Sequence, residues 1–259
     1  MIRIVTLFIL LAPLFLSACV RSQARLPREE SSRSHYHLGL AHLNEGQVQQ
    51  ASLEFQKAVE IDPKNRDARY FLGHTYFLKE DLPQAARQFQ EVLALDVNDA
   101  DAHNYLGRIY ATEGRIDLAI AEYQKALANP AYETPQHSHH NLGLVYMIQG
   151  KYADAAAAFR QALRIDPGAV RSRNMLGRTY FQMGQIAEAI AEYKQALQLA
   201  PDASNIHFYL GEAYLKQDAK ASARGEFEKV VELDPTSPEA AESRKYLDAL
   251  AVGAPSLAR

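Results

Sequence analysis

The protein's 259 residues carry a formal net charge of −3, because 28 Lys and Arg nearly balance 31 Asp and Glu. This balance argues against nucleic acid as the main partner, since phosphate backbones are bound by clustered positive charge. Hydrophobic residues make up 47% of the chain, which is enough for one or two globular domains with a sizeable core. Cys19 is the sole cysteine, so an intrachain disulfide is excluded and stability must come from packing.

The N-terminus has the pattern of a signal peptide. Arg3 precedes an apolar run over residues 4–16, which is too short to span a bilayer comfortably. The run ends in Leu16-Ser17-Ala18-Cys19, which resembles the bacterial lipobox, where the chain is cut before the cysteine and the thiol receives a diacylglycerol. This resemblance implies a signal peptide over residues 1–18 and a lipid on Cys19, with palmitate among its acyl chains. The alternative is a small apolar cysteine that lies near the N-terminus by chance.

The residues after Cys19 bear on where such an anchor would hold the protein. Val20 in place of Asp is similar to lipoprotein sorting patterns that favour the outer membrane, with the protein on its periplasmic face. Residues 19–31 are rich in Arg, Ser and Gln and show no apolar periodicity. We therefore expect a lipidated, flexible tether over this range.

A Leu-Gly pair recurs six times in the remaining chain, and its glycines are 34, 34, 36, 34 and 34 residues apart. The six leucines are Leu38, Leu72, Leu106, Leu142, Leu176 and Leu210. Each copy keeps an alanine twelve residues after the glycine and an aromatic residue four further on. A tyrosine stands three residues after every glycine except the first, where His42 replaces it. Pro63, Pro167, Pro201 and Pro235 close four of the copies.

The stretch over residues 137–167 is the cleanest copy of this unit. Two apolar stripes at helical spacing are separated by Gly150, which suits the left-handed conformation just after a helix. Pro167 restricts the residue before it and ends the second stripe. The pattern predicts a helical hairpin, and because two such helices cannot bury their apolar faces alone, it also predicts neighbouring hairpins.

The period, the small residues, the aromatics and the prolines agree in one register, and together they resemble the tetratricopeptide repeat (TPR) family. The resemblance implies an all-α fold, a right-handed α-solenoid of six helical hairpins. The expected repeats are residues 32–65, 66–99, 100–135, 136–169, 170–203 and 204–237. Two extra residues lie between the third and fourth copies, within residues 128–135, and should change the angle between these repeats.

A last apolar stripe follows the repeats. Ala241, Tyr246, Leu247 and Leu250 share one side of a predicted helix over residues 238–250. A repeat array needs a polar outer face at its end, so this segment is expected to be a capping helix. We expect residues 251–259 to form a disordered tail.

No segment is left over for a catalytic domain, and no phosphate-binding loop, Cys-x-x-Cys, Gly-x-Ser-x-Gly or HExxH motif is present. We predict no catalytic residue, no cofactor and no metal. One alternative is a metal-dependent enzyme that uses the cluster of His137, His139 and His140. Repeat geometry explains such residues without a metal, because His35, His103, His139 and His207 all stand three residues before the leucine of a Leu-Gly pair.

TPR proteins line their concave surface with the first helix of each pair, and this resemblance implies a groove for a protein or peptide partner. Carried over residue by residue, the groove comprises Tyr36, Leu40, Leu43, Tyr70, His74, Phe77, Asn104, Arg108, His140, Leu144, Met147, Asn174, Arg178, Phe181, Phe208, Glu212 and Leu215. Asn104 with Arg108 and Asn174 with Arg178 are i, i+4 pairs that could hold a backbone amide or a carboxylate. The alternative is that the apolar members pack against the next repeat and the polar ones face water.

An anchored solenoid with a groove and no catalytic motif predicts a non-enzymatic scaffold for other proteins. Residues 126–135, followed by Asn141-Leu-Gly-Leu144, resemble the corresponding junction in the PilF/PilW pilotin family of type IV pilus biogenesis lipoproteins. This resemblance implies a role in assembling or localising a secretin in the outer membrane. A second hypothesis is an envelope adaptor lipoprotein that organises peptidoglycan enzymes or outer-membrane assembly factors.

Overall fold

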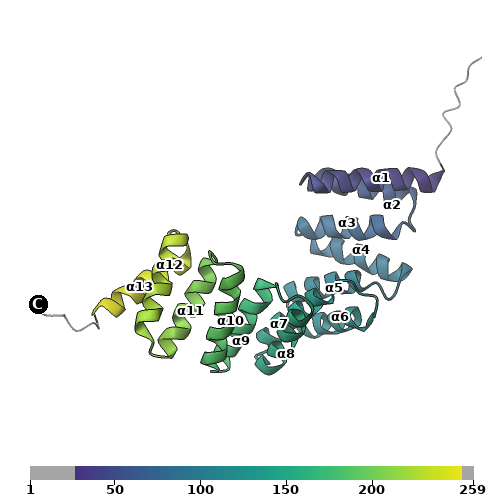
Figure 1. Cartoon of the computed structure of the whole chain (residues 1–259). Coiled ribbons are helices and arrows are strands. Elements are labelled where there is room, and N and C mark those ends of the chain that lie inside the picture. The colour runs from purple at the N-terminus through teal and green to yellow at the C-terminus, as the bar shows by residue number, and fades with distance from the viewer. Residues whose placement is uncertain (1–26, 253–259) are drawn as a thin grey trace, which may run out of the picture.

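A computed structural model describes residues 27–252 of the chain, and within this range it contains thirteen helices and no strand (Figure 1). The helices follow one another as antiparallel pairs with short connections. Their bounds are α1 Arg28–Asn44, α2 Val48–Ile61, α3 Arg66–Leu78, α4 Leu82–Leu95, α5 Ala100–Thr112, α6 Ile116–Ala128, α7 Pro135–Ile148, α8 Tyr152–Ile165, α9 Val170–Gln182, α10 Ile186–Leu199, α11 Ser204–Lys216, α12 Lys220–Leu233 and α13 Pro238–Val252.

The turn inside each hairpin uses a residue with positive φ. Gly46, Gly114, Gly150 and Gly184 have φ between 70° and 75°, as predicted for Gly150. The N–H of the residue after Gly150 donates to the carbonyl of Tyr146 at 2.9 Å, which satisfies an open carbonyl at the end of α7. In the second and sixth hairpins the same place is held by Glu80 and Asp218, at φ 60° and 57°.

Within each hairpin, the glycine of the Leu-Gly pair faces the aromatic residue of the second helix. A Cβ added to Gly143 would lie 2.5 Å from the Phe159 ring, so the helices approach too closely for any side chain there. The facing rings are Phe55, Phe89, Tyr123, Phe159, Tyr193 and Phe227, all almost fully buried. These glycine–aromatic contacts explain why the two residue types recur in one register.

Between hairpins, the second helix of one packs against the first helix of the next. The leucine before the glycine lies in this interface and is at most 6% exposed from Leu72 to Leu210. Leu38 is 46% exposed, because no described hairpin precedes it. The repeats therefore share a continuous core that runs the length of the array.

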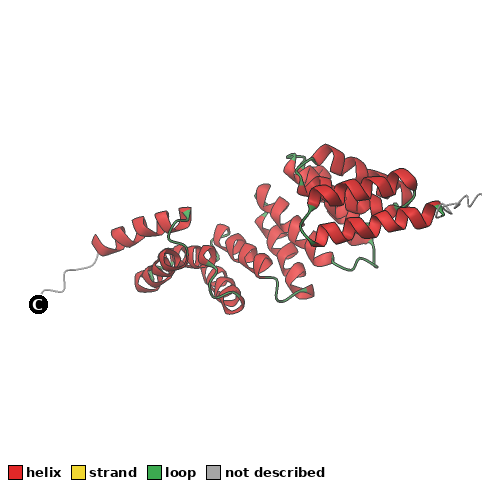
Figure 2. Ribbon diagram, turned by 90° about the horizontal axis from the view of Figure 1, so that it is seen from above, coloured by secondary structure: helices red, strands yellow, loops and turns green. Residues whose placement is uncertain are grey.

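Figure 1 shows the array as two arms: the pairs from α1 to α6 stack in one direction, and those from α7 to α13 continue in another. Figure 2 shows the same array of helices from above. The change of direction falls at the loop between α6 and α7, where the two extra residues lie. None of the helices in residues 27–252 is long and apolar enough to cross a membrane.

The structure corrects two boundaries. The tether was expected to reach residue 31, but α1 begins at Arg28, because Glu29 and Glu30 suit the positive N-terminal end of a helix. Ser32, in the first turns of α1, also donates to the carbonyl of Ala58 at 2.8 Å. The last helix extends to Val252 rather than ending at residue 250. The predicted signal peptide, Cys19 and most of the predicted tail lie outside the described residues.

Candidate partner-binding groove

A cleft of about 1000 Å³ lies where the two arms meet. Residues from the second to the fifth hairpin line it, with the loop between α6 and α7 contributing Thr134. Five of the predicted groove residues are among them, namely Tyr70, Asn104, Arg108, His140 and Leu144. The cleft therefore gathers the central part of the predicted groove into one concave site.

The other predicted residues lie along the first helices on either side of the cleft. Of all seventeen predicted groove residues, fourteen are half-buried and three are buried, namely Asn104, Asn174 and Phe208. The apolar members pack on the core as well as facing the surface: Tyr36, Leu40 and Leu43 lie against Phe55 and Leu72. Packing between repeats, the alternative weighed for these residues, thus accounts for much of their apolar surface.

An aromatic wall with one guanidinium forms the side of the cleft nearest the N-terminus. Tyr70 lies edge-on to Tyr105 with ring centroids 5.8 Å apart, and Tyr105 stacks on Phe89 at 4.8 Å. The guanidinium of Arg108 lies 4.3 Å from the Phe77 ring centroid and 4.9 Å from that of Tyr105. Cation–π contacts of this kind hold the charge of Arg108 at the mouth of the cleft.

Burial shifts the pKa of several groups around this wall. Desolvation, with the positive charge of Arg171 nearby, lowers the pKa of His140 to about 4. The same cause raises the pKa of Tyr70 well above its ordinary value. Burial, reinforced by the negative charge of Asp99, also raises the pKa of the Asp101 carboxyl. Near neutral pH, His140 is therefore a neutral hydrogen-bonding group, and its Nδ1 lies 2.9 Å from Ser172 Oγ.

The two Asn–Arg pairs predicted as equivalent differ in the structure. Asn104 Oδ1 accepts hydrogen bonds from Ser138 Oγ at 3.1 Å and from Asn141 Nδ2 at 3.0 Å. Asn174 is 4% exposed, and its Oδ1 has no hydrogen-bond partner within the described part of the chain. Of the two asparagines, only Asn104 thus has its side-chain oxygen engaged by hydrogen bonds.

A smaller pocket of about 140 Å³ holds predicted residues of the fifth and sixth hairpins. Arg178, Phe181 and Glu212 line it together with Tyr209. Arg178 lies 4.6 Å from the centroid of the Tyr209 ring, and Glu212 accepts a hydrogen bond from Tyr246 Oη at 3.2 Å. This pocket continues the groove beyond the bend.

Sequence reasoning missed several residues of the central cleft, chiefly Tyr105, Asn141 and Arg171. Tyr105 and Asn141 stand immediately before the leucine of their Leu-Gly pairs. The other copies carry His37, Phe71, Met175 and Tyr209 at this position, and the recurrence of a large side chain in all six copies is the signal that could have found it. Arg171 could not have been found this way, because its place in the cleft depends on the bend.

The histidine cluster does not converge on a common point. His137 is exposed and lines the cleft, His139 is half-buried, and the Nδ1 of His140 is engaged by Ser172. Three of the histidines at the shared repeat position have glutamate partners on the second helix of their hairpin, with Nδ1–Oε2 distances of 2.6 Å for His35, His103 and His207. Over residues 27–252, no group of three His, Cys, Asp or Glu is placed to hold a metal ion.

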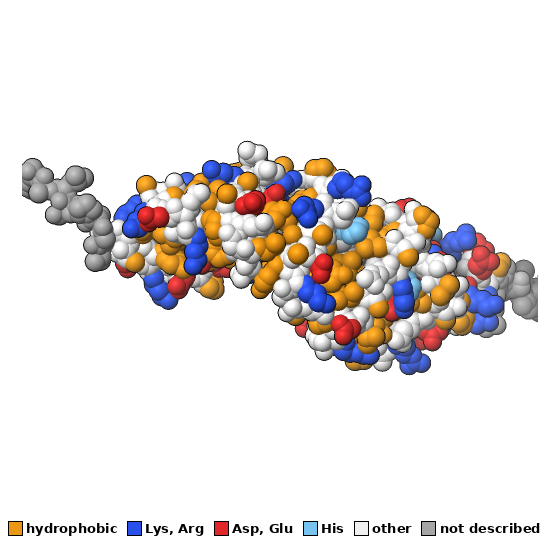
Figure 3. Space-filling model, turned by 90° about the horizontal axis from the view of Figure 1, so that it is seen from below, with side chains coloured by type: hydrophobic (Ala, Val, Ile, Leu, Met, Phe, Trp, Pro, Cys, Tyr) orange, Lys and Arg blue, Asp and Glu red, His pale blue; other side chains and the backbone are white. Residues whose placement is uncertain are grey.

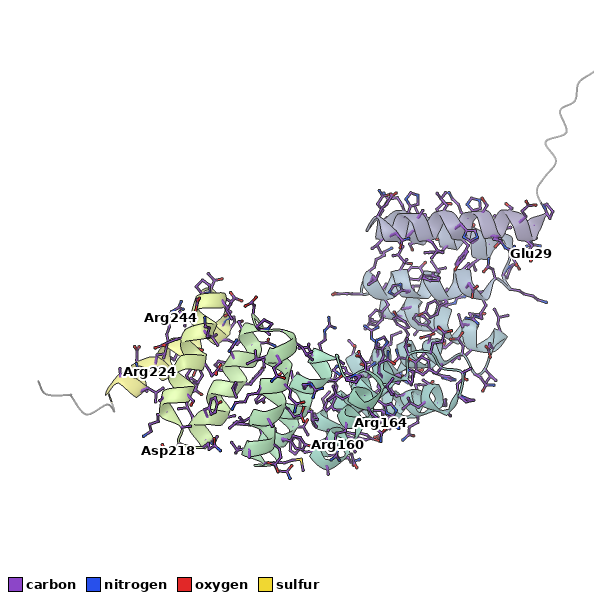
Figure 4. The ribbon with its side chains drawn as sticks, in the orientation of Figure 1. Glu29, Arg160, Arg164, Asp218, Arg224 and Arg244 are labelled. Carbon is purple, nitrogen blue, oxygen red and sulfur yellow. The ribbon has the colours of Figure 1, made fainter. Side chains whose placement is uncertain are left out.

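The surface around these sites carries both hydrophobic and charged side chains. Seen from below, Figure 3 shows hydrophobic side chains gathered along the middle of the molecule, with Lys, Arg, Asp and Glu spread towards the rim. Figure 4 shows Arg160 and Arg164 on α8 at the outer corner of the bend, away from the space between the arms.

Models of the tetratricopeptide repeat match residues 32–65, 70–134, 146–192 and 207–237, and a TPR repeat model matches 177–218. Together with the helical hairpins, these matches show that the chain belongs to the tetratricopeptide repeat family. No curated protein sequence matches it.

Among solved structures, the chain is similar to PilF from Pseudomonas aeruginosa, with a TM-score of 0.75 and 22% identity over 84% of this chain and 98% of that one. PilW, described as a widely conserved type IV pilus biogenesis factor, gives a TM-score of 0.75 and 21% identity over 85% and 98%. YrrB, a TPR protein with an unusual peptide-binding site, gives 0.60 and 19% over 74% and 97%.

Proposed function

We propose that this TPR protein is a non-catalytic scaffold of the bacterial outer membrane that binds a protein partner in its central cleft during type IV pilus biogenesis. The observation that carries the proposal is the likeness to PilF and PilW, which extends over 98% of each of those chains at a TM-score of 0.75. The likeness covers 84% and 85% of this chain rather than a few repeats. A secretin is the partner that the pilotin resemblance implies.

The cleft supports a protein partner rather than a small substrate. It combines the Tyr70 and Tyr105 rings, the Arg108 guanidinium and two asparagine side chains in an open hollow that spans several repeats. Aromatic residues and arginine dominate the energetics of protein interfaces, because they bury a large area and keep polar groups for specific contacts. Grooves of this kind take an extended or helical segment of another chain.

Site-specific photo-crosslinking in cells tests the partner. A photoreactive residue at Arg171, exposed in the cleft, should capture the secretin, and the same residue at Arg164, exposed on the outer side of α8, should not. Recovery of peptidoglycan enzymes without secretin would reject the pilus role in favour of an envelope adaptor. Equal capture from both positions would reject the cleft as the binding site.

The proposed anchor is tested separately. Cys19 follows the lipobox-like Leu16-Ser17-Ala18, so Cys19→Ala should abolish incorporation of labelled palmitate and release the protein from the outer-membrane fraction, while the repeats still fold. Labelled palmitate in the variant at the wild-type level would show that the lipid assignment is wrong. Circular dichroism of the variant, which should keep the helical spectrum of wild type, is the control for folding.

A further inference from the structure

One position of the repeat carries a basic side chain in every copy. It stands three residues before the leucine of the Leu-Gly pair and is held by His35, Arg69, His103, His139, Arg173 and His207. In four copies this side chain reaches the carbonyl of the residue six positions earlier, in the loop that precedes its helix. The atoms are Arg69 Nε and Pro63 O at 2.7 Å, His103 Nε2 and Val97 O at 3.0 Å, Arg173 Nη2 and Pro167 O at 2.9 Å, and His207 Nε2 and Pro201 O at 2.8 Å. The side chain thus ties the loop between two hairpins to the second of them.

A second contact joins the same side chain to the other helix of its hairpin. Arg173 Nη1 lies 3.1 Å from Glu192 Oε2 on α10, and His207 Nδ1 lies 2.6 Å from Glu226 Oε2 on α12. Each glutamate stands 19 residues after its partner. Both acceptors are oxygens, and arginine can donate to both because it has five N–H donors and keeps its charge. Arg173 therefore forms a clamp, in which one cation lies between a loop carbonyl and a carboxylate.

Histidine can complete this clamp only when its ring carries both protons. A neutral imidazole has one N–H donor and one acceptor nitrogen, whereas a carbonyl and an ionised carboxylate only accept. The carboxyl group is ordinarily the stronger acid, so the proton shared by Glu226 and His207 belongs to the ring. The buried His103 repeats the pattern, with Nδ1 2.6 Å from Glu122 Oε2 and Nε2 facing a loop carbonyl. Lys125 Nζ donates to the other oxygen of Glu122 at 2.8 Å, as expected for an ionised carboxylate.

The surroundings of His207 favour the charged ring. Its side chain is 12% exposed. The hydrogen bond with Glu226 raises the pKa of His207, and the carbonyl of Pro201 adds to the rise, whereas burial and the positive charge of Lys229 oppose it. Glu226 and Lys229 lie on α12, and Pro201 lies in the loop between α10 and α11. The ring is therefore held between two separate parts of the fold.

His139 shows how the same position behaves without the carboxylate. Ala158 stands 19 residues after it, where Glu226 stands in the sixth hairpin. Burial, with the positive charge of Arg164 nearby, lowers the pKa of His139. Repeat position alone therefore does not favour the charged ring, and the glutamate is what distinguishes His207.

We propose that His207 is held as an imidazolium in place of the guanidinium of Arg173, and that it fastens the junction between the fifth and sixth hairpins in mild acid and releases it as the pH rises. Loss of the proton leaves one hydrogen for two oxygen acceptors, so either the loop carbonyl or the carboxylate loses its donor. The pKa of His207 is raised in the folded chain, so its contribution to stability is complete below the ordinary value of about 6.5 and is lost as the pH rises through the folded value. This clamp is independent of the cleft and of its partner.

Histidine NMR on the full chain in detergent tests the charge of the ring. The His207 ring signals, assigned from their absence in His207→Arg, should titrate above about pH 6.5 and above those of His139, and both ring nitrogens should carry hydrogen below the midpoint. Glu226→Gln should lower the His207 midpoint, because it removes the negative partner, and leave that of His139 unchanged. A His207 midpoint at or below that of His139, or one that Glu226→Gln leaves in place, would overturn the proposal.

Hydrogen exchange of α11 and α12 tests the effect on the junction, with His207→Arg as the variant that keeps its charge at every pH. The two proteins are compared at the same pH, so that intrinsic exchange rates cancel. They should exchange alike at about pH 5.5, and wild type should exchange faster at about pH 8.5. The helices α1 and α2, at the other end of the array, are the internal control and should show no difference. No difference at the higher pH, or one of the same size at both, would refute the pH-dependent clamp.

Discussion

The glycine of each Leu-Gly pair is the residue at which two helices come closest. At Gly143 the added Cβ of an alanine would lie 2.5 Å from Phe159, whereas at Gly73 the nearest atom of Phe89 is 3.1 Å away. Gly143→Ala should therefore lower the free energy of unfolding by about 1 to 3 kcal/mol, since the fully buried ring must move. Urea unfolding followed by circular dichroism measures the change.

Gly73→Ala is the matched control for this prediction. The same substitution gains about 1 kcal/mol of helix propensity at both sites, and only at Gly143 is that gain outweighed by the clash. Gly73→Ala should be neutral or slightly stabilising. If both variants lose the same stability, close approach of the helices is not the reason for the recurring glycine.

Glu80 adopts a left-handed backbone conformation, which is unfavourable for a residue with a Cβ. Its φ of 60° matches the glycines at the equivalent turns, and Asp218 repeats the exception at 57°. Glu80→Gly should raise the free energy of unfolding by about 0.5 to 1 kcal/mol, because glycine removes the left-handed strain. Thermal unfolding measures it. Glu113→Gly, at φ −75° one residue before Gly114, should destabilise instead.

His140 makes the free energy of unfolding of the array depend on pH. Its pKa of about 4 in the folded chain lies below the ordinary value of about 6.5, so the unfolded chain binds the proton more readily between these values. Its contribution to stability is complete above about pH 6.5 and is lost as the pH falls towards 4. Arg171 and His137 face this ring and oppose its protonation.

The measurement compares unfolding free energies of wild type and His140→Phe at pH 7 and pH 4. Wild type should lose about 2 to 3 kcal/mol more than the variant over this interval. The other titrating groups are common to both proteins, so the difference isolates His140. Parallel losses would contradict the assignment.

Among the elements, α13 closes the core at the end of the array. Its Tyr246 stacks on Phe227 with ring centroids 4.7 Å apart and an interplanar angle of 13°, and it also lies near Phe208. Tyr246→Ala should cost about 2 to 4 kcal/mol, because it opens the apolar cluster of the sixth hairpin to water. Calorimetry measures the loss, and dye binding reports the exposed surface.

Lys245→Ala is the control on the same helix. Lys245 is exposed, and its ion pair with Glu242 is a surface pair of the kind that contributes little to stability. A loss as large as that of Tyr246→Ala would mean that the helix itself, rather than its apolar face, matters at this site.

At the scale of the whole molecule, each hairpin contacts mainly its two neighbours along the chain, so stability should be transmitted from repeat to repeat. Tyr123→Ala, in α6, should speed amide exchange in both arms, because Tyr123 shares a buried cluster with Leu142 and Val145 of α7 across the junction between them. Phe55→Ala, in the first hairpin, should speed exchange mainly in α1 to α4. Hydrogen exchange with mass spectrometry maps the effect, and a uniform increase over every helix in both variants would contradict it.

Much of the fold could be predicted because its contacts are local in sequence. The glycine, the alanine and the aromatic residue of one hairpin lie within 16 residues of one another, and their repetition reveals the hairpin without knowledge of distant contacts. The start of α1 was misplaced because Arg28 to Ser31 have no apolar pattern, although their acidic residues favour a helix start. Ser32 is held by the carbonyl of Ala58 in the next helix, a contact that periodicity does not show.

The groove was only partly predictable. Repeat position placed Tyr70, Asn104, Arg108, His140 and Leu144 on one surface, and all five line the cleft. It could not separate Asn104 from Asn174, because the two differ only in what the following hairpin presents to them. Arg171 and Thr134 enter the cleft through the bend and the loop, which have no counterpart in the other repeats.

The sequence by itself determined the helical hairpins, their number and their order, since each depends on residues a few turns apart that recur at a constant period. Only the tertiary structure decided where the array turns and which polar groups meet there. Asn104 lies on α5, Tyr132 in the loop between α6 and α7, and Ser138 and Asn141 on α7, and they are joined only after the hairpins have stacked. The physical reason is that hydrogen bonds are short and directional, so a small shift between repeats, invisible in periodicity, decides whether a buried amide finds a partner.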